Sequence, residues 1–289
     1  MHSELFSIGP IKLNMFGLCM ALGFLAAWQM LVVLLRRTGQ SFHQVEMLLT
    51  FVMLSAILGA RVMYIVEHWT AEFAGRPSAI FRLDLGGLVY YGGFIGALIP
   101  YIVYAVWHRK SFFEMGDVSA AVLPLGQAFG RLGCFMHGCC FGKHTDAWLG
   151  VSFPQRAPAW WDQLNAGLIS EKASKSLPVI PTQLIESAAT LALFALLFTL
   201  YPKHYKRRGL ISGLYLIGYA VLRFGIEYLR GDPRAAVGPF SISQAISIAI
   251  FAGGVGCIAW AILSSRIEAT RHNIIESNRV TPTRLDSTR

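Results

Sequence analysis

Charged residues are scarce in this 289-residue chain. Asp, Glu, Lys and Arg make up 14% of it, against 54% hydrophobic residues and a mean hydropathy of +0.50. A soluble domain carries about 25% charged residues. The shortage argues against a water-soluble domain, whose surface such side chains would have to cover, and indicates a chain surrounded largely by lipid.

Two further features are missing. The first ten residues contain no Lys or Arg and so lack the basic region of a cleaved signal peptide. We therefore expect the first apolar run to remain as a membrane helix. The two halves of the chain also show no matching pair of broken helices, which a transporter built from structural repeats would show.

Long apolar runs are abundant. A helix needs about 20 mostly apolar residues to cross a bilayer, and seven runs reach roughly that length. They are residues 15–35, 47–66, 85–107, 118–136, 183–201, 210–229 and 240–263. We predict an all-α integral membrane protein with one transmembrane domain (1–263). A long outer loop (137–182) follows the fourth span, and a polar tail without regular structure (264–289) ends the chain.

Basic residues are distributed unevenly over the predicted loops. Arg36–Arg37, Arg109–Lys110, four residues within 203–208 and five arginines after residue 263 share one side of the topology. Lys and Arg concentrate in short cytoplasmic loops, so we expect the C-terminus in the cytoplasm and the N-terminus outside. This arrangement accounts for the net charge of +9 without a nucleic acid partner, and the expected partner is the lipid bilayer.

Five ionisable residues interrupt the apolar runs: Arg61, Arg131, Glu186, Arg223 and Glu227. A charge at the bilayer centre costs about 2.5–3.5 kcal/mol on insertion scales, and such residues usually face a cavity or a site. Arg223 and Glu227 are one helical turn apart, which also allows a mutual ion pair. Arg131 has no acidic neighbour within a turn and needs a partner from another helix or an anionic ligand. Arg61 is expected to snorkel or to pair with Glu186.

The segment from Gly130 to Gly142 combines glycines and cysteines. Its glycines, with Gly126 before them, make it a poor simple helix that either packs closely against a neighbour or breaks to line a cavity. Four side chains resemble metal ligands, namely Cys134, His137, Cys139 and Cys140, but they lack the paired Cys-x-x-Cys spacing of structural zinc. A disulfide between adjacent cysteines would be strained. We expect no metal and no cofactor, and assign these side chains no chemical role.

Several short motifs occur in a specific order. They are Phe6–Pro10, Gly59–Arg61, Leu88–Gly93, Gly130–Gly133, Phe141–Gly142, Pro181–Leu184 with Glu186, and Gly218–Tyr219 followed by Arg223, Glu227 and Arg230. Over seven spans, this order resembles the prolipoprotein diacylglyceryl transferase family. The resemblance implies a multi-pass enzyme of the bacterial inner membrane with no cofactor. Such an enzyme joins the diacylglyceryl group of phosphatidylglycerol to the lipobox cysteine of a preprolipoprotein through a thioether, and releases glycerol phosphate.

The resemblance also implies roles for individual residues. The expected catalytic residues are Arg131, Arg223, Glu227 and Tyr91, and the expected substrate-binding residues are Arg131, Gly142, Tyr219, Glu186, Gln183 and Arg61. Guanidinium groups donate parallel hydrogen bonds to phosphate. We therefore expect Arg131 and Arg223 to bind the lipid phosphate and stabilise the leaving group. Glu227 would orient Arg223 or accept the thiol proton, and Tyr91 would donate a hydrogen bond.

Three departures separate this chain from the enterobacterial form of the family. Tyr91 replaces a histidine often proposed as the base, Cys134 and Cys139 replace an asparagine and a glutamate, and Phe16 replaces a tyrosine. The departures are compatible with a paralogue that uses another thiol or lipid. Two other classes stay open: a transporter with an arginine-lined cavity, and a structural subunit whose charges only pair between helices.

Overall fold

The computed structural model describes residues 4–8, 11–40, 42–75, 78, 80, 89–107, 112–232 and 236–280. These ranges are almost entirely helical. The α-helices are α1 (Met15–Thr38), α2 (Phe42–Glu67), α3 (Tyr90–Trp107), α4 (Phe112–His137), α5 (Pro158–Asn165), α6 (Thr182–His204), α7 (Leu210–Glu227) and α8 (Ile242–Val280). A π-helical turn, η1 (Trp69–Phe73), follows α2. Two antiparallel hairpins complete the list, β1 (Glu4–Ile8) with β2 (Ile11–Asn14) and β3 (Ala236–Val237) with β4 (Phe240–Ser241).

Six helices in the described ranges are long and apolar enough to cross a membrane, namely α1, α2, α4, α6, α7 and α8. The apolar part of α3 is shorter. The predicted third span starts at residue 85, and residues 81–88 lie outside the described ranges. The prediction of an all-α integral membrane protein is confirmed.

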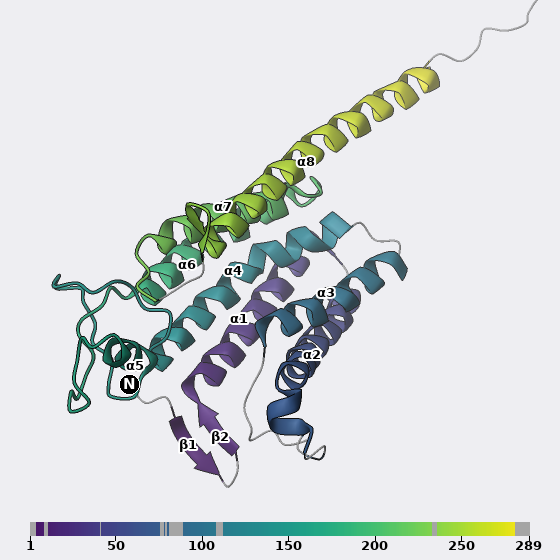
Figure 1. Cartoon of the computed structure of the whole chain (residues 1–289). Coiled ribbons are helices and arrows are strands. Elements are labelled where there is room, and N and C mark those ends of the chain that lie inside the picture. Colours follow the sequence, from purple (N-terminus) through teal and green to yellow (C-terminus); the bar gives the residue numbers. More distant parts are fainter. Residues whose placement is uncertain are drawn as a thin grey trace, which may run out of the picture.

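The helices form antiparallel neighbours, with α1 against α4, α4 against α6, α7 against α8 and α2 against α3 (Figure 1). The C-terminal ends of α2, α4 and α7 therefore meet the N-terminal ends of α3, α6 and α8 at one end of the bundle. The β1–β2 hairpin and α5 lie at this same end (Figure 1). Every residue expected in the site is on this half of its helix or in the adjoining loop.

Glycines bring α2 and α3 into close contact. A Cβ on Gly59 would collide with the carbonyl oxygen of Gly92, and a Cβ on Gly96 would collide with the carbonyl oxygen of Ser55. Small residues are typical of such interfaces in membranes because they let two helix backbones approach. This packing explains the glycine positions of the Gly59–Arg61 and Leu88–Gly93 motifs.

The glycine-rich part of α4 is a regular helix as far as His137, and of the two arrangements expected for it, close packing against a neighbour is the one found there. A Cβ on Gly133 would lie 3.0 Å from Cδ2 of Phe16, and one on Gly130 would lie 3.4 Å from Sδ of Met20. These glycines fit α4 against α1, and this packing overrides low helix propensity. The helix ends at Gly138, whose φ of +81° is in the left-handed region.

The last helix is longer than the apolar run that predicts it. The run ends at residue 263, but α8 continues through the polar segment to Val280. Residues 264–280 contain neither glycine nor proline, so no residue in this stretch interrupts the helix. The expectation that regular structure ends at Ser264 is therefore wrong.

The long loop between α4 and α6 folds over a small core of its own. Phe153 is fully buried in it, and Trp160 is 3% exposed. The indole Nε1 of Trp160 donates to the carbonyl oxygen of Ala173 at 2.8 Å, while the backbone N–H of Leu177 donates to Oε1 of Gln163 at 2.7 Å. The loop is thus a compact cap at the end of the bundle that carries the expected site.

Candidate active site

Arg131 forms an ion pair between two helices. It lies near the C-terminal end of α4, and its Nη2 is 2.9 Å from Oε1 of Glu186 on α6. The Glu186 side chain is 2% exposed and that of Arg131 is 22% exposed. A guanidinium carries five N–H donors, and a single carboxylate cannot accept from all of them. Arg131 can therefore hold Glu186 and still present donors to a phosphate.

Arg61 lies apart from this ion pair. Glu186 pairs with Arg131 and not with Arg61, so the pairing expected for Arg61 is wrong. Nη2 of Arg61 donates to the carbonyl oxygen of Ile80 at 3.4 Å, and its guanidinium carbon is 5.5 Å from the ring centroid of Tyr64. These contacts keep the guanidinium at the C-terminal end of α2.

Tyr91 is in the first turn of α3, with 64% of it exposed. The backbone N–H of Val89 donates to the carbonyl oxygen of Ala60 at 3.1 Å, which sets the start of α3 beside Arg61. Tyr91 belongs to neither the Arg131–Glu186 pair nor the Arg223–Glu227 pair. Arg61 and Tyr91 thus lie on α2 and α3, whereas the two ion pairs join residues of α4, α6 and α7.

A polar seam joins α4 to α7. Nε2 of Gln127, one turn before Arg131, donates to the Tyr215 hydroxyl at 2.8 Å. The rings of Tyr215 and Tyr219 stack with centroids 6.0 Å apart. The four-residue spacing on α7 thus puts Tyr219 on the same helix face as Tyr215, whose hydroxyl meets α4.

Arg223 and Glu227 form the expected ion pair within α7. Nη2 of Arg223 lies 3.0 Å from Oε2 of Glu227, with side chains 11% and 6% exposed. The same Nη2 donates to Oγ of Ser243, at the start of α8, at 2.9 Å. Ser243 is a partner that the sequence did not indicate, because a single serine after a loop is a common feature. The pair is fixed between two helices.

The first turn of α6 holds the loop that follows α4. Oγ1 of Thr182 donates to the carbonyl oxygen of Cys140 at 2.8 Å. Nε2 of Gln183, a residue only 1% exposed, donates to the carbonyl oxygen of Cys139 at 2.7 Å. This hydrogen bond shapes the loop next to Arg131, and the expected role of Gln183 in substrate binding stays a prediction.

Gly142 sits where three chain segments converge. Its N–H donates to the carbonyl oxygen of Ile180 at 2.9 Å, and it forms a β-bridge with Arg230. A Cβ there would lie 2.7 Å from the carbonyl oxygen of Ile180 and 2.8 Å from that of Leu229. Backbone atoms on both sides leave no room for a side chain.

The Gly142→Ala substitution is expected to lower the free energy of unfolding by about 1–3 kcal/mol, as overpacking typically does. The added methyl group would force apart the segments that precede α6 and follow α7, because it meets the carbonyl oxygens of Ile180 and Leu229. Thermal unfolding in detergent measures the effect, with Gly225→Ala as the matched control because no atom lies within 4 Å of a Cβ there. Equal melting points for the two variants would contradict this account of Gly142.

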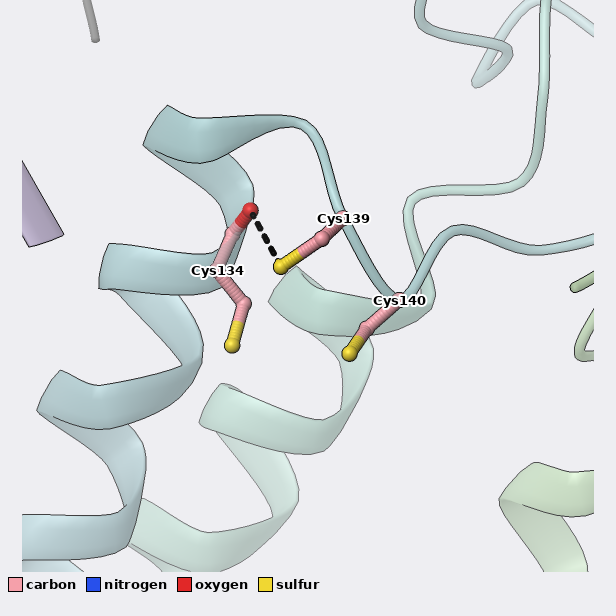
Figure 2. Close-up of side chains that lie close together, drawn as sticks. All are labelled: Cys134, Cys139 and Cys140. Atoms are coloured by element: carbon pink, nitrogen blue, oxygen red, sulfur yellow. Dashed lines mark hydrogen bonds between the residues drawn. The ribbon is translucent and has the colours of Figure 1, made fainter. Parts of the chain in front are cut away.

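Cys134, Cys139 and Cys140 come together at the end of α4 (Figure 2). Their Sγ atoms all lie within 4.8 Å of one another, and Sγ of Cys139 donates to the carbonyl oxygen of Cys134 at 3.8 Å. His137, considered with them as a ligand, is exposed and is not in the cluster. The sequence did not predict this cluster because the left-handed backbone at Gly138 and Cys140 creates it.

Arg230 extends the site beyond the end of α7. It is 6% exposed, and its Nε and Nη2 donate to the two carboxylate oxygens of Asp232, each at 2.8 Å. The neighbouring thiols of Cys134 and Cys139, and then the Arg230 guanidinium, hold the pKa of the Cys140 thiol below its ordinary value, although burial opposes this.

Asp117 anchors the opposite end of α7. It is 1% exposed, and its Oδ2 accepts from the N–H of Gly209 while its Oδ1 accepts from the N–H and Oγ of Ser212, each at 2.7 Å. The residue preceding α7 is Gly209, which has no side chain to cap the helix. An aspartate one residue before a predicted span was the available signal, and the sequence reasoning missed it.

An apolar cavity of about 360 Å³ lies between α1, α2 and α4. Its lining includes Phe24, Trp28, Ile57 and Gly126. Ile57 is one turn before Arg61 on α2, and Gly126 is five residues before Arg131 on α4. The cavity therefore runs along α2 and α4, whose C-terminal ends carry Arg61 and Arg131. Its volume is within the range of ligand pockets.

Residues 3–260, which include this whole site, match the family model described as prolipoprotein diacylglyceryl transferase. The phosphatidylglycerol–prolipoprotein diacylglyceryl transferase of Xanthomonas oryzae pv. oryzae is 34% identical over 266 residues, which cover 88% of this chain and 89% of the relative. The transferase 2 of Clostridium perfringens is 33% identical over 257 residues, with 88% and 93% covered. The transferase of Pseudoalteromonas atlantica is 30% identical over 274 residues, which cover 92% of this chain and 91% of the relative. The chain belongs to the prolipoprotein diacylglyceryl transferase family.

Proposed function

We propose that this protein transfers the diacylglyceryl group of phosphatidylglycerol to the lipobox cysteine thiol of a preprolipoprotein. Its relatives are named for a transfer from phosphatidylglycerol to prolipoproteins and match most of the chain. The observation that carries the proposal is the interhelical Arg131–Glu186 pair, a cation held in a membrane helix with part of its surface accessible. Such a group suits an anionic lipid headgroup.

The proposed reaction is an alkyl transfer. The thiol sulfur attacks the glyceryl carbon bound to phosphate, the carbon–oxygen bond breaks, a thioether forms and glycerol phosphate leaves. A free thiol has a pKa of about 8.5 and is largely protonated at neutral pH. The site must therefore remove the thiol proton and stabilise negative charge on the departing phosphate.

Arg131 is placed to stabilise that charge, because its guanidinium is oriented by Glu186 before any ligand arrives. A donor that is fixed in advance stabilises a transition state without reorganisation. Arg223 is the second phosphate ligand in this proposal, and its contact with Glu227 supports an orienting role for that carboxylate. Glu227 is also the proposed acceptor of the thiol proton.

Residues around this pair complete the proposed site. Tyr219 donates to the headgroup beside Arg131, while Gln183 and Gly142 keep the adjoining loop in place. Arg61 and Tyr91 face the substrates from the α2–α3 side, with Tyr91 as a hydrogen-bond donor. The apolar cavity below Arg61 accepts an acyl chain of the lipid, since its walls are almost entirely hydrocarbon.

The proposal includes location and partners. The protein spans the membrane several times, and we place it in the bacterial inner membrane with the N-terminus and the site on the outer side. There it meets phosphatidylglycerol in the bilayer and the signal peptides of lipoprotein precursors. No cofactor and no nucleic acid takes part in the proposed reaction.

The test is transfer from labelled phosphatidylglycerol to a lipobox peptide by the purified protein in lipid vesicles. We expect a thioether-linked diacylglyceryl peptide, identified by mass spectrometry, and none with phosphatidylethanolamine or with a Cys→Ser peptide. A Tyr91→Phe arm measures the contribution of the hydroxyl, and full activity there would remove it from the mechanism. Lipid movement between leaflets without any thioether would contradict the proposed function and favour a transporter.

A further inference from the structure

The cluster of Cys134, Cys139 and Cys140 is not used by the proposed reaction. The three Sγ atoms lie within 4.8 Å of one another, and Figure 2 shows the side chains turned toward one another, Cys134 from α4 and the other two from the loop after it. All three are free thiols and only partly exposed. Three sulfur atoms are therefore held at one place, largely shielded from water.

The backbone holds these thiols in position. Cys140 has a φ of 63°, a left-handed conformation that residues with a Cβ adopt uncommonly. Strained conformations of this kind persist where surrounding contacts impose them, and they cluster at functional sites. Here Thr182 and Gln183 anchor the carbonyl groups of Cys140 and Cys139. The loop cannot relax without breaking both hydrogen bonds.

Positive charge surrounds the cluster. Arg230, which is buried and donates to Asp232, lies close enough to Cys140 to lower the pKa of its thiol. Arg131 interacts electrostatically with both Cys134 and Cys140. A nearby cation favours the thiolate form of a cysteine, which is the form that binds metals. Two cationic side chains, Arg131 and Arg230, thus lie beside the cluster.

The ligand set selects the class of metal. No His, Asp or Glu joins this group within the ranges that the structure describes, so the fourth ligand of a closed structural zinc site is missing there. Soft thiolate ligands select copper(I). A metal bound about 2.3 Å from each of three sulfurs in a trigonal plane would hold them about 4 Å apart, which is inside the 4.8 Å limit that the three Sγ atoms meet.

We propose that Cys134, Cys139 and Cys140 bind one copper(I) ion through three thiolates. The spacing argument against zinc in the sequence concerns four-ligand sites and does not apply to a three-sulfur site. Binding forms three copper–sulfur bonds and releases to solvent the protons of those thiols that are still protonated. No electrons are transferred. The proposal is independent of the proposed transferase function.

The experiment is anaerobic competition for copper(I) between the reduced, detergent-purified full chain and a chromogenic chelator. We expect one equivalent bound per chain, with an X-ray absorption spectrum that shows only sulfur ligands. Cys134→Ser, Cys139→Ser and Cys140→Ser combined should weaken binding at least about 100-fold, because even losses outside the ligand set cost 10–100-fold. The matched control is Cys19→Ser with Cys257→Ser, which removes two thiols outside the cluster.

Several results would overturn the proposal. They are unchanged binding in the triple variant, an equal loss in the control variant, nitrogen or oxygen ligands in the spectrum, or zinc bound as tightly as copper(I). If the triple variant fails to fold, which its thermal unfolding reports, the wild-type protein decides the question. A wild-type chain that cannot take copper(I) from the chelator would then rule the site out.

Discussion

The Arg131→Ala substitution is expected to lower the rate of diacylglyceryl transfer by about 10²–10³-fold, the usual cost of losing a fixed donor to developing negative charge. In the structure, Arg131 combines an ion pair to Glu186 with a partly accessible guanidinium. Transfer from labelled phosphatidylglycerol to a lipobox peptide measures the loss. Arg36→Ala is the control, because Arg36 is an exposed arginine at the other end of the bundle.

A second variant separates activity from folding. Removing Arg131 alone leaves a carboxylate that is 2% exposed without its partner, and breaking a buried pair costs about 3–5 kcal/mol. The double variant Arg131→Gln with Glu186→Gln removes both charges, so it should recover stability but remain inactive. Full transfer activity in the double variant would instead show that the Arg131–Glu186 pair is structural and does not bind the lipid phosphate.

The Asp117→Ala substitution is expected to lower the free energy of unfolding by about 2–4 kcal/mol. Hydrogen bonds to charged groups contribute about 1.5–3 kcal/mol, and the loss of a helix cap costs about 0.5–2 kcal/mol. Asp117 accepts three hydrogen bonds at the start of α7, two from backbone N–H groups and one from a hydroxyl. Without it, those backbone groups are buried and have lost their acceptor.

Thermal unfolding in detergent measures that loss, and amide hydrogen exchange at Gly209 and Ser212 locates it. Asp117→Asn keeps one carbonyl acceptor and should lie between the wild type and Asp117→Ala. Asp146→Ala is the control, since the Asp146 side chain is 96% exposed and should change stability little. Unchanged exchange at Gly209 and Ser212 in Asp117→Ala would show that the cap is not what stabilises the start of α7.

Sequence and structure agree best where the constraint is one of length. A bilayer requires runs of about 20 apolar residues, and the predicted runs coincide with α1, α2, α4, α6, α7 and α8 to within a few turns, except at the end of α8. The need of Arg131 for a partner could also be inferred, since a lone charge in a membrane helix is costly. The identity of the partner of Arg131 could not be inferred, because Glu186 lies 55 residues further along the chain.

The Gly130–Gly142 segment likewise has features that its sequence determines and features that only the tertiary structure decides. Its sequence alone determined that helix propensity is low and that close packing or a break must follow, because glycine has no Cβ. Only the tertiary structure decided between the two: Gly133 packs on α1, whereas Gly138 ends the helix. The turn after Gly138 brings three thiols together, and Thr182 and Gln183 hold it from α6. Contacts between distant segments determine that arrangement, and local sequence spacing does not encode them.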